Sequence, residues 1–378
     1  MRALIGSYTI PSPWTGTPHA HGAGISVLAI GEGGGSRDSD GAAGTGAAPA
    51  ARSLALDGAA RPELNPSFLV LGEDGRSVWA VTEPEHGGEL LRFELSPDGR
   101  LADAPPARIE TGADAPCHVA LGPGVALVSH YHGGAVSVVV RDDADRPARV
   151  AELIRTPTTG EGWDRADAVS RPHSALFLPG TDCFAVADYG RDLVLLYRWD
   201  RGAAATALVQ AVPLPEGTGP RHLAWRGPGE RGERAELLLV SNQEGGGVTV
   251  LGIERGERGI ALVHKQTAPG PGLGRERPVP SEIAVHPDGE HAVLANRFDD
   301  SLTVYGIDAA GSLTERVTVD SDGRNPRHFA FAPDGSMLVV AHQDSDELVA
   351  FAWRDGAPAD PVALEAATPT AVLFVPER

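Results

Sequence analysis

Apolar residues in this chain recur in short alternating runs, and seven of these runs follow a proline in the same phrase. The phrase is proline, any residue, a small or polar residue, and then an alternating apolar stretch. It begins at Pro66, Pro116, Pro172, Pro220, Pro280, Pro326 and Pro369. Successive copies lie about 50 residues apart, which suits a four-stranded propeller blade with irregular outer loops.

Each repeat also contains later apolar runs that predict further strands. In the repeat that starts at Pro280, the turn HPDG at 286–289 leads to a second run at 291–298. A third run follows at 302–307 and a weaker fourth at 315–319. Alternating runs separated by Gly-containing turns predict antiparallel strands, four to a repeat.

The two ends of the chain complete the count. Residues 3–9 and 24–30 look like a second and a third strand without a first, and residues 370–375 look like a first strand without the rest. The sequence therefore predicts an all-β, seven-bladed propeller that forms one domain over residues 1–378. Its ring closes when the C-terminal strand pairs with the N-terminal strands, which leaves no sheet edge open. The Gly-, Ala- and Ser-rich stretch that starts at Gly31 is predicted to be a flexible outer connection.

Composition and charge restrict the partners. The chain has 47 Gly and 31 Pro, which favours turns over long helices, and its formal net charge is −19 at pH 7. A surface this acidic repels a phosphate backbone, so we expect no nucleic acid partner. The sequence shows no apolar leader and no long apolar run, so we expect no membrane partner. Cys117 and Cys183 lack the spacings of disulfide frameworks or zinc sites. These features predict a cytoplasmic protein, with its oligomeric state left open.

The blade topology predicts where polar side chains gather. The first strand of a blade lines the central channel and the second runs antiparallel beside it, so the first strand begins where the second ends. The side chains predicted to ring this opening are Glu83, His118, His130, Arg171, His173, Asp188, Arg221, His222, Gln243, Glu244, Glu282, Arg297, Arg327, His328 and Gln343.

Four members of this ring, Arg171, Arg221, Arg297 and Arg327, concentrate positive charge in an acidic protein. Such a concentration predicts an anion site, because guanidinium groups bind carboxylate or phosphate through paired hydrogen bonds. A neighbouring His transfers protons near neutral pH. The set suits the opening or closing of a carboxylated or phosphorylated lactone ring.

Other chemistries lack their motifs. No nucleophile elbow, zinc-protease helix, Walker loop or dinucleotide fingerprint occurs in the required context, so we predict no cofactor. His130 and His132 have the residue type of metal ligands, but the sequence places no carboxylate beside them, and we predict no metal.

Several phrases resemble the lactonase family of seven-bladed propellers, which includes bacterial 6-phosphogluconolactonases and fungal 3-carboxy-cis,cis-muconate cyclases. They include SHYHGGAVSVV from Ser129, RPHSALF from Arg171, GPRHLAW from Gly219 and NPRHFAFAPDG from Asn325. The resemblance spans nearly the whole chain. It implies a metal-free lactone reaction that uses a His, two Arg and a Glu around the channel.

The resemblance assigns the His to His173 and the two arginines to Arg221 and Arg327. The chain departs from the family at the acid. Where the family has Asn followed by Glu, this chain reads Asn242, Gln243 and Glu244. A one-residue slip turns a strand side chain to the other face, so either a bulge brings Glu244 into the channel or the carboxylate is missing there.

Together these inferences predict a lactone hydrolase of carbohydrate metabolism whose partner is a small anionic sugar lactone, 6-phosphogluconolactone in particular. Its catalytic residues are predicted to be His173, Arg221, Glu244 and Arg327. Its substrate-binding residues are predicted to be His118, His130, Arg171, Asp188, His222, Gln243, Glu282, Arg297, His328 and Gln343. Two alternatives stay open: a carboxymuconate-type cycloisomerase, and a non-catalytic propeller that binds a small anion or a protein.

Overall fold

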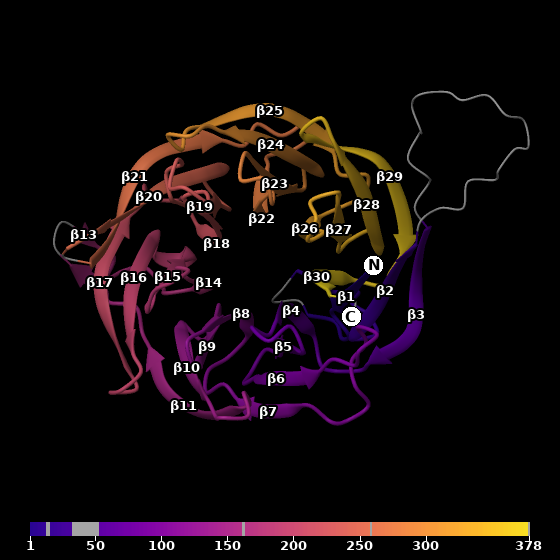
Figure 1. Ribbon diagram of the computed structural model, residues 1–378, viewed down its shortest axis with the longest axis horizontal. Coiled ribbons are helices and arrows are strands. Elements are labelled where there is room, and N and C mark those ends of the chain that lie inside the picture. The colour runs from indigo at the N-terminus through magenta and orange to yellow at the C-terminus, as the bar shows by residue number, and fades with distance from the viewer. Residues whose placement is uncertain (13–15, 32–52, 161–162, 258, 377–378) are drawn as a thin grey trace, which may run out of the picture.

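Seven four-stranded antiparallel sheets stand around a ring in the computed structural model, which describes residues 1–12, 16–31, 53–160, 163–257 and 259–376 (Figure 1). The predicted all-β, seven-bladed architecture is therefore confirmed. The predicted flexible connection after Gly31 falls on residues 32–52, which lie outside the described residues.

Six blades are continuous in the chain and run from the innermost to the outermost strand. The first three are β4 (Pro66–Leu71), β5 (Ser77–Thr82), β6 (Glu89–Glu94) and β7 (Ala107–Glu110); β8 (Pro116–Gly122), β9 (Val125–His130), β10 (Ala135–Arg141) and β11 (Pro147–Ile154); and β14 (Pro172–Phe177), β15 (Cys183–Asp188), β16 (Leu193–Asp200) and β17 (Ala205–Pro213).

The next three are β18 (Pro220–Arg226), β19 (Leu237–Asn242), β20 (Gly247–Gly256) and β21 (Gly259–Pro269); β22 (Val279–Val285), β23 (His291–Arg297), β24 (Ser301–Ile307) and β25 (Leu313–Asp320); and β26 (Pro326–Phe331), β27 (Met337–His342), β28 (Glu347–Arg354) and β29 (Ala357–Glu365). A small sheet of β12 (Thr159–Gly160) and β13 (Trp163–Asp164) and the 3-10 helix η2 (Tyr189–Arg191) lie in the connections.

The seventh blade is assembled from both ends of the chain. It contains β30 (Pro369–Val375) innermost, then β1 (Arg2–Ser7), β2 (Ile25–Gly31) and β3 (Ser53–Arg61). Leu4 pairs with Leu373 across β1 and β30. Figure 1 shows the yellow C-terminal strand beside the indigo N-terminal one, so the predicted closure of the ring is confirmed.

Apolar side chains between neighbouring blades form the core. Val136 and Val138 of β10, for example, cluster with Val186 of β15 and Leu195 of β16, and all four are almost completely buried. Burying a side chain of this kind stabilises the fold by about 1.5–3 kcal/mol. This packing holds the inner strands at fixed positions around the channel.

The ladder between the first two strands is interrupted near the proline in every blade. The register shifts between Pro116 and His118, and between Pro172 and Ser174, and the other inner strands repeat this irregularity. Proline lacks the N–H that the ladder needs, and a bulge re-aims the side chain that follows it. The residue after each proline is thus placed differently from the rest of its strand.

Candidate active site

A cavity of about 170 Å³ lies where the inner strands begin. We call this end of the channel the mouth. The cavity is lined by Glu83, Cys117, Tyr131, His132, His173, Arg221, Gln243, Arg297 and Arg327. These residues lie either at the start of an inner strand or at and just after the end of a second strand, so the blade topology brings them together as expected.

The prolines explain four of these positions. Cys117, His173, Arg221 and Arg327 each directly follow the proline that opens β8, β14, β18 or β26. The bulge at that point turns the side chain to the cavity instead of continuing the pleat. The repeat therefore supplies a thiol, an imidazole and two guanidinium groups from equivalent places in four blades.

Two of the cavity arginines have buried donors without acceptors. Arg221 is only 3% exposed, and its Nε and one terminal nitrogen find no hydrogen-bond partner among the described residues. One terminal nitrogen of Arg297 is also without a hydrogen-bond partner within the described part of the chain. Burial, and then the nearby Arg327, lowers the pKa of Arg221 to about 10. Buried charged donors normally have partners, so these nitrogens indicate a place for a bound anion.

Glu83 is the one carboxylate among the described residues that lines the cavity. It is 4% exposed, and its Oε2 accepts a 2.9 Å hydrogen bond from the Tyr8 hydroxyl. Arg327 in turn donates a 2.6 Å hydrogen bond to that hydroxyl. Burial raises the pKa of Glu83, although the charges of Arg327 and Arg221 oppose the shift.

His173 is neutral near pH 7. Burial, and then the charge of Arg221, holds its pKa well below the usual value. Its ring lies edge-on to those of Tyr131 and His222, with centroids 5.5 and 5.1 Å away. A neutral imidazole accepts or donates hydrogen bonds but is not a strong acid, so it suits orienting a water molecule.

A second polar group adjoins the cavity. Glu282 Oε2 lies 2.7 Å from His222 Nδ1 and 3.2 Å from His328 Nε2, and the ring of His118 lies 5.5 Å from that of His222. Burial lowers the pKa of His118 to about 3. These residues, predicted to bind substrate, contact one another and stand beside the cavity without lining it.

The structure does not bring all predicted residues to the cavity. His130 is fully buried with Nε2 2.8 Å from the hydroxyl of Ser137. Asp188 accepts hydrogen bonds from the Ser170 hydroxyl and from the backbone of Arg171 and Arg191. Local hydrogen bonds thus occupy both side chains.

Arg171 and Gln343 are both outside the lining of the mouth cavity. The guanidinium group of Arg171 stacks 5.0 Å from the Tyr131 ring and donates to its hydroxyl at 3.2 Å. Gln343 lines a different cavity of about 300 Å³, with His19, His21 and Thr368 among its neighbours. Arg171 therefore positions a cavity residue, whereas Gln343 belongs to another surface.

Gln243, not Glu244, faces the cavity. Glu244 follows β19 in the turn to β20, where the backbone N–H groups of Glu244 and Gly245 both donate to the Thr218 carbonyl, at 3.1 and 3.0 Å. The Glu244 side chain is 37% exposed and accepts 2.9 Å hydrogen bonds from Tyr189 and Arg277. This local irregularity does not bring Glu244 into the cavity lining, which has Gln243 at the family's acid position.

Several residues in or beside the cavity were outside the predicted site. Tyr8, which contacts Glu83, comes from the N-terminal part of the seventh blade, where the repeat is split. Tyr131 and His132 follow β9, in the loop after the strand end that was considered. Cys117 has the same place after its proline as His173 and Arg221, and this equivalence was a usable signal in the sequence.

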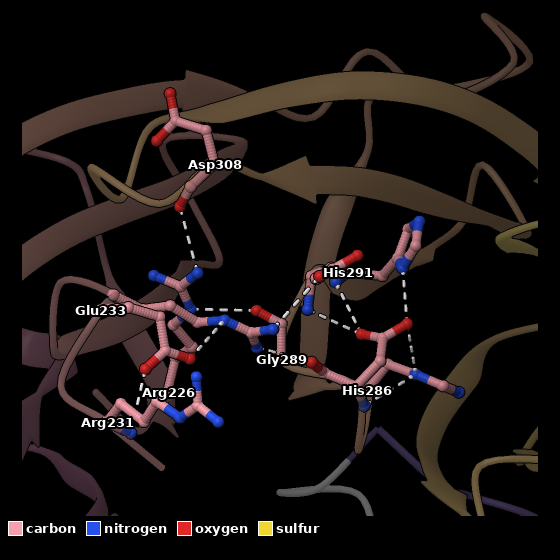
Figure 2. A network of polar contacts seen from close by, with 10 residues as sticks. Arg226, Arg231, Glu233, His286, Gly289, His291 and Asp308 are labelled. Atoms are coloured by element: carbon pink, nitrogen blue, oxygen red, sulfur yellow. Dashed lines mark hydrogen bonds and ion pairs between the residues drawn. The ribbon is translucent and has the colours of Figure 1, made fainter. Parts of the chain in front are cut away.

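A separate polar cluster surrounds the turn between β22 and β23 (Figure 2). This turn lies where an inner strand ends, away from the mouth at which the inner strands begin. His286 Nδ1 and His291 Nδ1 lie 2.9 and 2.8 Å from Asp288 Oδ2, a grouping of metal-ligand types. Arg316, which only donates, lies 2.8 Å from His291 Nε2, so Nδ1 of that ring carries the proton. In this tautomer His291 Nδ1 donates to Asp288 Oδ2, so the three side chains form a hydrogen-bonded turn.

Comparisons with known proteins agree with the fold. Residues 35–374 match the family model described as "Lactonase, 7-bladed beta-propeller". The chain is 25% identical over 312 residues to 6-phosphogluconolactonase of Bacillus subtilis, across 76% of this chain and 80% of that protein. It is 23% identical over 300 residues to 6-phosphogluconolactonase of Formosa agariphila, across 76% and 81% of the two chains.

Among solved structures, the periplasmic gluconolactonase PpgL of Pseudomonas aeruginosa superposes with a TM-score of 0.78. Its sequence is 24% identical, and the match covers 99% of both chains, which supports the shared fold. Within the part of the chain that the structure describes, no helix has the length and apolar character needed to cross a membrane.

Proposed function

Because this chain belongs to the lactonase family of seven-bladed β-propellers, we propose that it hydrolyses an anionic sugar lactone at the mouth cavity, with 6-phosphogluconolactone as the first candidate. Relatives from Bacillus subtilis and Formosa agariphila carry the name of that activity, and this supports the choice of substrate. The observation that carries the proposal is the set of buried, unpaired guanidinium nitrogens on Arg221 and Arg297.

Charge favours an anionic lactone over a neutral one. Three arginines line the cavity against one carboxylate, Glu83. A buried cation without a counter-charge is unfavourable, so the binding of a phosphate or carboxylate in the cavity is favourable. The cavity is small, and the phosphate end of the substrate fits among the arginines while the rest reaches the open mouth.

Arg221 and Arg327 act on the charge of the substrate. One guanidinium group holds the anionic substituent, and the other donates to the carbonyl oxygen as it becomes negative. Removing a single donor of this kind costs about 2.7–4 kcal/mol in the transition state. His173, neutral and edge-on to Tyr131, orients the attacking water.

The test is the hydrolysis of freshly generated 6-phosphogluconolactone, corrected for its spontaneous opening. The proposal predicts acceleration by the native protein and its loss in Arg221→Ala and in His173→Ala. Arg149→Ala, an exposed arginine on the outer strand β11, is the matched control and keeps the native rate. Full activity in Arg221→Ala would remove the site from consideration.

A non-catalytic anion-binding propeller is the second candidate, and Gln243 at the family's acid position favours it. The same arginines would then hold an anion without turnover. Calorimetric binding of 6-phosphogluconate without acceleration of lactone hydrolysis identifies this case. A muconate substrate in the same panel tests the cycloisomerase alternative, which uses nearly the same residues.

We also propose a cytoplasmic location. Cys117 and Cys183 are both buried free thiols, which suits a reducing compartment. The Pseudomonas relative is named as periplasmic, so cell fractionation of the native host is the measurement that decides.

A further inference from the structure

We propose that Glu83, positioned by Tyr8, is the carboxylate that moves the proton during lactone opening, an assignment that rests on the proposed function. The cavity needs such a group because Gln243 has an amide where the family has an acid. Among the described lining residues, Glu83 alone is a carboxylate. It comes from the end of β5, across the channel from the β18–β21 blade that carries Gln243 (Figure 1).

The hydrogen bonds around Glu83 fix which oxygen is reactive. Arg327 can only donate, so the Tyr8 hydroxyl accepts from it at 2.6 Å and gives its own proton to Glu83 Oε2 at 2.9 Å. Oε2 is therefore held as an acceptor. In the proposal the second oxygen, Oε1, takes and returns the proton, and the Ser67 side chain adjoins the same carboxyl group.

Asn65 holds this arrangement in place through the backbone. Its side-chain oxygen accepts from the N–H groups of Thr9 and Ile10, directly after Tyr8. Its side-chain nitrogen donates to the Glu83 carbonyl at 3.2 Å, and its own carbonyl accepts from the Glu83 N–H at 3.0 Å. One residue thus ties the tyrosine and the glutamate segments together, as a preorganised catalytic group requires.

Basicity separates Glu83 from His173. Burial raises the pKa of the carboxyl group, whereas burial and Arg221 lower the pKa of the imidazole well below its usual range. A proton carrier works best when its pKa lies near the working pH, and a strongly depressed imidazole is a weak base. Glu83 is therefore the better proton acceptor of the two.

The proposed step balances. Water forms a bond to the lactone carbonyl carbon as its proton passes to Glu83 Oε1. The bond between that carbon and the ring oxygen then breaks, its electron pair stays on the ring oxygen, and the proton on Glu83 moves there. The product is the open hydroxy acid, which releases its acidic proton to solvent, and Glu83 returns to the carboxylate.

The first test compares Glu83→Gln with Glu85→Gln, an exposed glutamate two residues away. Glu83→Gln keeps the shape and the acceptor for Tyr8, so we expect kcat to fall about 10²–10⁴-fold with KM and 6-phosphogluconate affinity little changed. Glu85→Gln should retain the native kcat. A Glu83→Gln protein with native kcat would overturn the assignment.

Tyr8→Phe gives a second readout that a purely structural role would not produce. The Tyr8 hydrogen bond lowers the pKa of Glu83, so its loss raises that pKa further. The low-pH limb of the kcat profile should move to higher pH in Tyr8→Phe and disappear in Glu83→Gln. An unmoved limb in both variants would exclude Glu83 as the titrating base.

Glu244→Gln tests the rival carboxylate directly. Loss of kcat in Glu244→Gln, with Glu83→Gln unaffected, would place the proton transfer on the Tyr189 side of the mouth. If the native protein accelerates neither a phosphorylated nor an unphosphorylated sugar lactone, the proposed function itself fails. An active native protein with an active Glu83→Gln variant refutes only the role of Glu83.

Discussion

His222 Nδ1 lies 2.7 Å from Glu282 Oε2, in the middle of the inner strands. His328 faces the same oxygen with Nε2 at 3.2 Å, while its Nδ1 accepts from the backbone N–H of Val372 on β30. Both rings can therefore be neutral and still donate to the carboxylate. The cluster links three blades and depends on its histidines remaining uncharged.

Acidification should destabilise the fold. Six histidines have lowered folded pKa values, chiefly through burial: His118, His130, His173, His222, His328 and His342. Below about pH 6.5 these histidines bind protons in the unfolded chain but stay neutral in the folded one. The free energy of unfolding therefore falls as the pH drops toward 4. Glu83 and Glu282, with raised pKa values, act in the opposite direction but are fewer.

The measurement is urea denaturation at pH 7.5, 6.5 and 5.5. The pKa of His342 is lowered to about 4. His342→Leu should therefore reduce the loss of unfolding free energy on acidification by up to about 1.4 kcal/mol per pH unit. A free energy of unfolding that stays constant over this range would contradict the neutral state of these rings.

Anions should stabilise the native protein through Arg221. Ligand present at about 100 times its Kd adds about 2.7 kcal/mol to the free energy of unfolding. Differential scanning fluorimetry with 6-phosphogluconate should show this as a higher Tm in the native protein and in Arg149→Ala. The shift should be absent in Arg221→Ala, and an equal shift in all three proteins would mean that the anion binds elsewhere.

Thr368→Asn should stabilise the seventh blade. Thr368 precedes Pro369 with φ of 44°, and the equivalent residues before Pro66 and Pro326 are Asn65 and Asn325 with φ of 45° and 58°. A β-branched residue is strained in this left-handed region, whereas Asn adopts it readily. We expect a gain of about 1 kcal/mol, measured by chemical denaturation.

The reverse change, Asn65→Thr, is the contrasting variant. It adds the same strain and also removes the acceptor for the Thr9 and Ile10 N–H groups. It should therefore destabilise by more than Thr368→Asn stabilises. Equal stability of both variants and the native protein would show that these backbone angles carry no strain.

Deletion of residues 369–378 should sharply lower the Tm. This removes all of β30, including the buried Val372, Phe374 and Val375, and leaves β1 unpaired on its inner side. Each buried apolar side chain contributes about 1.5–3 kcal/mol, so the loss is a large part of the stability of an ordinary domain. An unchanged melting curve would contradict the closure of the ring by β30.

The repeat made the fold predictable, because seven prolines mark equivalent positions and the alternation of apolar residues marks the strands. It also predicted which ends of which strands share a face, and this grouped His173, Arg221, Gln243, Arg297 and Arg327 correctly. The direction of individual side chains was not predictable. His130 and Asp188 have the same strand-end position as cavity residues, yet Ser137 and Ser170 hold them elsewhere.

The residue that supplies the carboxylate of the site was not predictable from the sequence either. The sequence could not reveal whether β19 bulges, so it could not decide between Gln243 and Glu244. Glu83 was predicted at the mouth, but its importance depends on Tyr8, a contact between residues 75 positions apart. Such a contact follows from the packing of two blades and not from either repeat alone.

The pairing of β1 with β30 also bears on how the protein is made. Strand β1 precedes its inner neighbour β30 by almost the whole propeller, so β30 is synthesised long after β1. Until then the inner edge of β1 has free backbone N–H and C=O groups and can pair with other chains. Synthesis of β30 therefore closes the ring and removes the open inner edge of β1 from the nascent chain.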